Sequence, residues 1–201
     1  MINERFENAK ELKDKLNQIK KLKSSLTELL KRIKFNDIKL EKRENHNSNT
    51  YSIIFPENII STYNELTGII EKETDDRKKK ICFYEIYEDI SFEYDGLSIR
   101  IQIYNEDSNR IHNPGSGLSQ SFRNLGLGKK IFKRIIQEVG FITSEHRDTF
   151  GEIKNSIQSD LLWFSLYNDD QVICKTNGNL FFAYLKKGKS FEHECNQYLK
   201  S

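Results

Sequence analysis

The stretch Arg123-Asn124-Leu125-Gly126-Leu127-Gly128 runs directly into Lys129-Lys130-Ile131-Phe132, where apolar residues begin to recur three and four positions apart. Two glycines therefore stand at the mouth of an expected amphipathic helix over 127–139, and Gly140 follows as its stop. Glycine lets backbone amides approach an anion without a Cβ in the way, and the helix dipole adds partial positive charge there. The pattern predicts an anion-binding loop, with a tight turn for close helix packing as the alternative.

The composition indicates one folded domain with an appendage. The chain has 201 residues, of which 36% are hydrophobic and 31% charged. The net charge of +2 gives no global attraction to nucleic acid, so we expect no nucleic-acid partner. No apolar run approaches the roughly 20 residues that cross a bilayer, and the charged N-terminus lacks a secretory signal. We expect a cytoplasmic protein, or a virion protein if a phage encodes it, since few prolines and many Lys, Asn and Ile fit an AT-rich genome.

The cysteines predict neither a disulfide framework nor a metal site. Cys82, Cys174 and Cys195 are odd in number and widely spaced. His193 stands two residues before Cys195, but no second pair of ligands lies nearby in the sequence. We therefore expect free thiols and no bound metal.

The N-terminal segment predicts one long amphipathic helix over 2–33, without glycine or proline. Its apolar residues form a narrow stripe, as in a coiled coil: Ile2, Phe6, Ala9, Leu12, Leu16, Ile19, Leu22, Leu26, Leu29 and Ile33. Such a stripe packs along its own domain, against a partner helix or against a second copy. All three alternatives stay open at the level of the sequence.

The remaining pattern alternates between strands and helices. Before the glycine motif we expect a short edge strand near Ile38 and Leu40, a strand over 51–55, a helix over 57–72 and a solvated charged linker over 73–80. Strands over 81–87, 91–94 and 97–104 follow, with a hairpin turn at Asp95-Gly96, and then a long loop over 105–122. After the helix over 127–139 we expect a strand over 141–144, a helix from Asp148 or Thr149 to Leu166, a hairpin of 171–176 and 180–185 around Asn177-Gly178, and a polar tail with a last helical turn. This order predicts an α+β fold with one parallel crossover at the glycine-loop helix.

Two motifs resemble those of the GNAT superfamily of N-acetyltransferases. Arg123-x-x-Gly126-x-Gly128 resembles the loop that holds the cofactor's pyrophosphate in that family. The segment Ser156-x-x-Ser159-x-x-Leu162-Trp163-x-x-Leu166 is similar to the family's Asn-x-x-Ala-x-x-Leu-Tyr-x-x-Leu helix. The resemblance implies a mixed, mainly antiparallel central sheet flanked by helices. It divides the chain into a helix over 1–35, a polar connector over 36–50, a GNAT-like domain over 51–185 and a tail over 186–201.

The resemblance also implies acetyl-coenzyme A as the cofactor. The residues it assigns to cofactor binding are Arg123, Leu125, Gly126, Leu127, Gly128, Lys129, Lys130 and Ser156. The family's general-acid tyrosine falls on Trp163, whose indole has no acid chemistry, so Tyr167, one turn further, is the candidate acid. An amine must lose a proton before it attacks, and Glu85, Glu93 and Glu106 are candidate bases by location, with Glu106 our choice.

Two functions follow from these patterns. The first is an N-acyltransferase that moves acetyl from acetyl-coenzyme A to an unidentified primary amine on a small molecule or a protein. The second is a non-catalytic interaction or assembly protein, such as a phage virion component, whose N-terminal helix binds a protein partner or a second copy. Trp163 at the expected acid position favours the second function, because beside Phe164 it is most simply a core residue.

Overall fold

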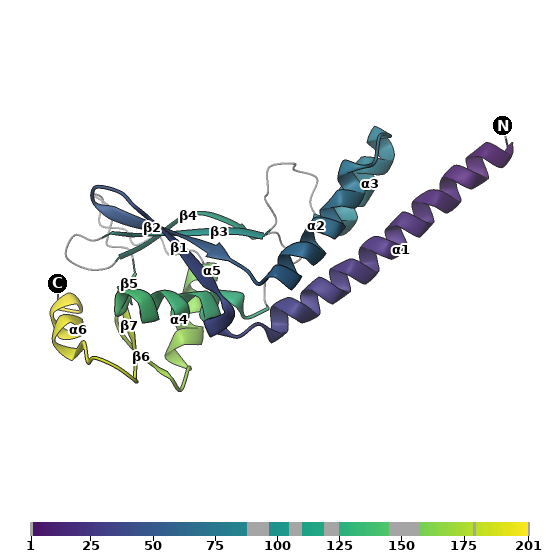
Figure 1. Ribbon diagram of the computed structural model, residues 1–201. Helices are drawn as coiled ribbons and strands as arrows, with labels where there is room; N and C mark the ends of the chain where they lie inside the picture. Colours follow the sequence, from purple (N-terminus) through teal and green to yellow (C-terminus); the bar gives the residue numbers. More distant parts are fainter. Residues whose placement is uncertain are drawn as a thin grey trace. The chain divides into compact units, whose positions relative to one another are not determined.

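The computed structural model describes residues 2–87, 97–104, 110–118, 125–144, 157–178 and 180–200, and within them the chain is α+β (Figure 1). The chain divides into two compact units. The first comprises Met1–Ile33, Phe55–Ser98 and Gly117–Leu127, and the second Lys34–Ile54, Ile99–Ser116 and Gly128–Ser201. The first unit holds the three N-terminal helices, and the second holds the strands except for the first two residues of β3 and the last two of β4.

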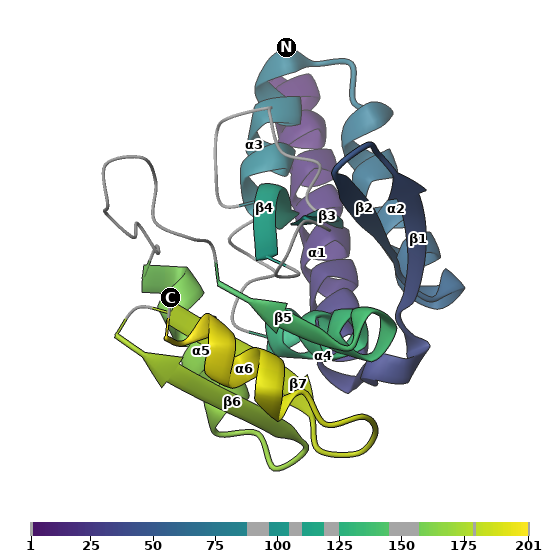
Figure 2. The same cartoon turned by 90° about the vertical axis from the view of Figure 1, so that its left-hand side faces the viewer.

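The helical unit is built from α1 (Ile2–Arg32), α2 (Glu57–Glu71) and α3 (Asp76–Tyr87). Each of these helices contacts the other two, so the expected N-terminal helix packs within its own unit (Figures 1 and 2). Its stripe is buried towards the C-terminal end at Ile19, Leu26 and Ile33, while the next residue after Leu29, Leu30, is buried and Leu29 itself is half-buried. The N-terminal end of the stripe is uncovered, since Phe6 is 72% exposed.

The expected strand over 81–87 is wrong, and the expected linker over 73–80 holds only for residues 73–75, because α3 begins at Asp76. The Asp75 carboxylate accepts hydrogen bonds from the backbone amides of Arg77 and Lys78 at 2.9 and 3.0 Å, which caps the helix start. The buried residues of α3 follow helical spacing: Cys82, Phe83, Ile86 and Tyr87. Their β-branched and aromatic character favours a strand locally, but burial against α1 and α2 decides for the helix.

The sheet unit contains seven described strands in the order β1-β2-β3-β4-β5-β7-β6. The strands are β1 (Lys39–Glu44), β2 (Ser48–Ile54), β3 (Leu97–Tyr104), β4 (Arg110–Leu118), β5 (Phe141–Thr143), β6 (Val172–Asn177) and β7 (Leu180–Leu185). Pairing is antiparallel for β1 with β2, β2 with β3, and β7 with both β5 and β6. In contrast, β4 pairs parallel to β5, and α4 (Leu127–Val139) lies between these two strands in the chain.

Several expected elements are confirmed. The alternation in β3 buries Ile99, Ile101 and Ile103, as predicted for a sheet with one covered face. The β6–β7 hairpin turns at Gly178, whose φ is 59°, and α4 ends at Gly140, whose φ is 95°. The edge strand near Ile38 is β1, which occupies much of the expected connector over 36–50.

Other expectations need correction or lie outside the description. The long loop over 105–122 is wrong in part, because Arg110–Leu118 forms β4 between two strands that supply its hydrogen-bond partners. The described part of the next helix is α5 (Ile157–Tyr167), and the polar tail contains α6 (Glu192–Tyr198). The strand over 91–94, the turn at Asp95-Gly96 and the cap at Asp148 or Thr149 lie outside the described residues.

Candidate functional site

The glycine motif lies at the start of α4. The helix begins at Leu127, and the preceding Gly126 has a φ of 72°, a backbone conformation that favours glycine. A Cβ built at Gly126 would meet nothing within 4 Å, so the space beside this residue is open. The first amides of a helix have no acceptor within the helix, and here they follow directly after that open turn. Arg123, the first residue of the motif, lies outside the described residues.

Gly128 has a different role from Gly126. A Cβ at this position would lie 3.1 Å from Cδ1 of Leu162, so the missing side chain lets α4 approach α5 closely. The sequence offered an anion loop and close packing as alternatives for this pair of glycines. The structure uses Gly128 for close packing, and it leaves Gly126 as the residue that shapes the turn.

A buried carboxylate on the sheet unit holds two lysines of α4. Asp169 follows α5 and accepts Nζ of Lys133 at 3.1 Å on Oδ1 and Nζ of Lys129 at 3.2 Å on Oδ2. The backbone amide of Gln171 also donates to Oδ1 at 2.9 Å. Burial raises the pKa of Asp169, but the Gln171 amide and the two lysines outweigh it and hold the pKa below its ordinary value. Lys129, expected to bind phosphate, therefore points at this carboxylate.

Lys133 is the more enclosed of the two lysines in this Asp169 cluster. It is buried, donates to Oε1 of Gln171 at 2.8 Å and lies 5.3 Å from the ring centroid of Phe35. Two lysines against one carboxylate leave one positive charge in excess near the start of α4. Lys130, next along the helix, has a pKa lowered first by burial and then by the charge of Lys129.

The sequence missed Asp169 and Gln171 because no motif marks them. The sequence does contain one signal for this cluster. Lys129 and Lys133 are four residues apart on α4, so they lie on one face of the helix, where a carboxylate from another segment could pair with both. The carboxylate itself comes from a loop 36 residues after Lys133, and only the fold brings the two together.

The two aromatic residues considered for the acid role, Trp163 and Tyr167, have different surroundings on α5. Trp163 is buried, stacks on Phe181 with ring centroids 5.3 Å apart and meets Phe132 edge-on at 6.2 Å, which confirms a core role. Tyr167 ends α5 and is largely exposed. Glu106 lies outside the described residues, as do Ser156 and Glu93.

Glu85, the remaining base candidate, lies on α3 of the helical unit and not on a strand. Its backbone carbonyl accepts Nζ of Lys23 at 3.0 Å. Its expected place on a strand before β3 is therefore wrong.

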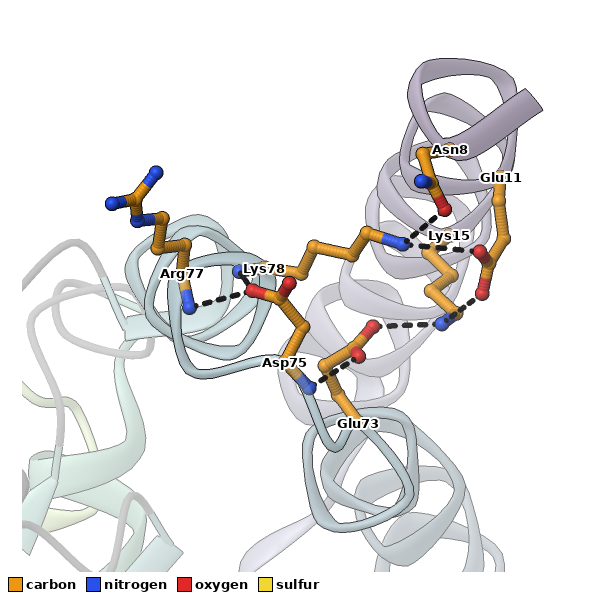
Figure 3. A network of polar contacts seen from close by, with 7 residues as sticks. All are labelled: Asn8, Glu11, Lys15, Glu73, Asp75, Arg77 and Lys78. Carbon is orange, nitrogen blue, oxygen red and sulfur yellow. Dashed lines mark hydrogen bonds and ion pairs between the residues drawn. The ribbon is translucent and has the colours of Figure 1, made fainter. Parts of the chain in front are cut away.

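A second polar cluster joins the helices of the first unit (Figure 3). Nζ of Lys15 on α1 donates to Glu11 at 2.6 Å and to Glu73, after α2, at 2.7 Å. Nζ of Lys78 on α3 donates to Glu11 at 3.1 Å and to Asn8 at 3.3 Å. Hydrogen bonding to Lys15 lowers the pKa of Glu73, and the Asp75 amide adds to this effect. This Glu73 cluster ties α1 to the α2–α3 turn, so its role is structural.

The three cysteines are free and buried. Burial raises the pKa of Cys174 to about 12, and the neighbouring thiol of Cys195 adds to this, so the Cys174 thiol stays protonated. Within the described residues, no group of three or more His, Cys, Asp or Glu side chains is placed to hold a metal ion.

The helices described here include none with the length and apolar character needed to cross a membrane. Comparisons with models of protein families, with curated proteins and with solved structures found no match to this chain.

Proposed function

We propose that this chain binds acetyl-coenzyme A at the start of α4 and transfers its acetyl group to a primary amine, with a GNAT-like arrangement of sheet and helices. The observation that supports the proposal is the parallel β4–α4–β5 crossover, whose helix begins directly after a glycine with φ of 72° and open space beside it. A crossover of this kind presents the helix N-terminus at the end of the strands, where phosphates bind.

The residues at this turn fit a pyrophosphate. The backbone amides of Leu127, Gly128 and Lys129 are the first of α4 and would donate to phosphate oxygens. The excess positive charge of the Asp169 cluster favours an anion nearby. The bound cofactor would supply the acetyl group as an activated thioester.

Proton transfer is the part that the chain must provide itself. Tyr167 at the end of α5 is the described side chain that we assign as the acid that protonates the coenzyme A thiolate as it leaves, since this largely exposed residue carries a hydroxyl donor. Trp163 cannot take this role, because its indole is enclosed by Phe132 and Phe181.

The test compares two nearly isosteric variants of the turn. Gly126→Asn and Gly126→Asp both tolerate a positive φ, but only aspartate adds a negative charge beside the amides. Calorimetric titration with acetyl-coenzyme A should show binding to the parent and to Gly126→Asn, and binding about tenfold weaker or worse to Gly126→Asp. Dephospho- and desulfo-analogues serve as controls for the other parts of the cofactor. Equal affinity of the two variants would rule out a phosphate site at this turn.

A second function is favoured by the uncovered N-terminal end of α1. In a non-catalytic assembly protein, the exposed Phe6 would insert into a protein partner. Deleting the whole helix is a poor test, because Ile19, Leu26 and Leu30 are buried parts of the helical unit. Phe6→Glu leaves that core intact. Loss of assembly in this variant would support the assembly function, provided that the parent protein does not bind acetyl-coenzyme A.

A further inference from the structure

Two helices of the chain carry large apolar side chains on an uncovered face. On α3 these are Ile81 and Tyr84, which are 44% and 55% exposed. On α5 they are Leu161, Phe164 and Tyr167, which are 62%, 65% and 58% exposed. Clusters of exposed apolar side chains on helical faces mark surfaces that bind other molecules.

The two faces share one spacing. On α3, Arg77, Ile81 and Tyr84 occupy positions i, i+4 and i+7, which lie on one side of a helix. On α5, Asp160, Phe164 and Tyr167 occupy the same three positions. Each face is therefore two turns long, with a charge at the first position and apolar residues at the next two.

The charges on the two faces are opposite. Arg77 and Lys80 are exposed on the α3 face, and the Arg77 guanidinium points away from the Glu73 cluster in Figure 3. Asp160 is exposed on the α5 face, and the exposed Asp170 follows three residues after Tyr167. No ion pair joins any of these four side chains to another residue of the described ranges.

We propose that the α3 face of one copy of this chain docks on the α5 face of a second copy. With the two helices parallel, Arg77 would lie opposite Asp160, and Ile81 opposite Phe164. Matched spacing and opposite charge within a single chain favour a second copy as the occupant over an unrelated protein. The contact is heterologous, so each docked copy keeps one further face for the next copy.

Sedimentation velocity on the full chain tests this association. The average mass should rise with protein concentration in the parent, and raised salt should weaken the rise because the charges are exposed. Tyr84→Glu alters the α3 face alone and Phe164→Glu the α5 face alone, and each variant by itself should remain monomeric. An equal mixture of the two should form a one-to-one dimer and nothing larger, because one intact face of each kind remains.

Charge variants provide an independent measurement that leaves the apolar residues in place. The pair Arg77→Glu and Lys80→Glu should weaken association about tenfold or more, and so should the pair Asp160→Lys and Asp170→Lys. Mixing these two proteins places opposite charges at both kinds of contact between unlike copies, so the mixture should regain the rise of average mass with concentration. Circular dichroism and thermal melting confirm that each variant remains folded.

The matched control is Phe6→Glu, which places the same charge at an exposed apolar position of α1 and should leave association unchanged. A monomeric parent at all concentrations would overturn the proposal. So would loss of association in Phe6→Glu, which would assign the contact to α1, or a mixture of Tyr84→Glu and Phe164→Glu that stays monomeric.

Discussion

Glu73 in the helical unit and Asp169 in the sheet unit are both nearly inaccessible, with side-chain exposures of 5% and 6%, yet their surroundings differ. The lysine that meets Glu73 is Lys15, which is 27% exposed and also binds Glu11. The lysine that meets Asp169 most closely is Lys133, which is only 10% exposed. Water can therefore solvate the ammonium group of Lys15 when Glu73 is removed, but it has little access to the ammonium group of Lys133 when Asp169 is removed. The lysine–carboxylate ion pair is partly hydrated in the helical unit and buried in the sheet unit.

The two clusters also differ in net charge. In the Glu73 cluster, Lys15 and Lys78 are balanced by Glu11 and Glu73. In the Asp169 cluster, two lysines face one carboxylate, and the excess positive charge lies on α4 near its start. Only the second cluster can favour a bound anion, and this difference supports the placement of the proposed cofactor site.

Asp169→Asn should have the largest effect on stability. Asparagine keeps the shape of the side chain but leaves the buried ammonium of Lys133 without a counter-charge, so we expect a loss of about 3 kcal/mol of unfolding free energy. Urea denaturation measures this loss of unfolding free energy, and Asp170→Asn, at the exposed neighbouring position, is the control. A loss below about 1 kcal/mol would mean that Lys133 is hydrated, and the contrast between the two clusters would fail.

Glu73→Gln should have a smaller effect, a loss of about 1 kcal/mol, because Lys15 keeps Glu11 and remains accessible to water. The same denaturation experiment applies, with the exposed Glu71→Gln as the matched control. If this variant lost as much stability as Asp169→Asn, exposure of the lysine would not explain the difference between the clusters.

The pH dependence should separate the two carboxylates. Both have folded pKa values below their ordinary values, which are 4.5 for Glu73 and 3.8 for Asp169. The stability that each contributes is therefore fully present above its ordinary value and is lost as the pH falls through the folded pKa. Acid titration followed by circular dichroism should show the cost of Glu73→Gln shrinking below pH 4.5, and that of Asp169→Asn only below pH 3.8. A cost that shrank above these values would indicate a raised pKa and contradict the assignment.

Glu11→Gln should have the smallest effect, since Glu11 is exposed and its two lysines have other partners in Glu73 and Asn8. We expect a drop in melting temperature smaller than that of Glu73→Gln, and one that vanishes in 1 M salt, where the Debye length is about 3 Å. A larger drop than in Glu73→Gln would show that Glu11, and not Glu73, holds α1 in place.

Local patterns predicted those parts of the fold that carry their own signals. The long apolar stripe predicted α1, and the Asn177-Gly178 turn predicted the β6–β7 hairpin. Local patterns gave the wrong prediction for α3, where β-branched and aromatic residues favoured a strand. They were also wrong for β4, where Pro114 and its neighbouring glycines favoured a loop. In both cases one stabilising partner lies far away in the sequence, α1 for α3 and β5 for β4.

The candidate site divides in the same way. The sequence predicted the helix over 127–139 and a glycine turn before it, because both depend on neighbouring residues. It could not predict that Gly128 faces Leu162, or that Lys129 points at Asp169. These are distances between segments more than thirty residues apart.

The sequence by itself determined the long amphipathic helix, the hairpin turn and the glycine before α4, because periodicity and φ preference act over a few residues. Only the tertiary structure decided that residues 76–87 form a helix, that Gly128 faces Leu162, and that Asp169 holds two lysines of α4. The physical reason is that burial and ion pairing depend on which distant segments meet. The free energy of such contacts outweighs the small local preference of each segment.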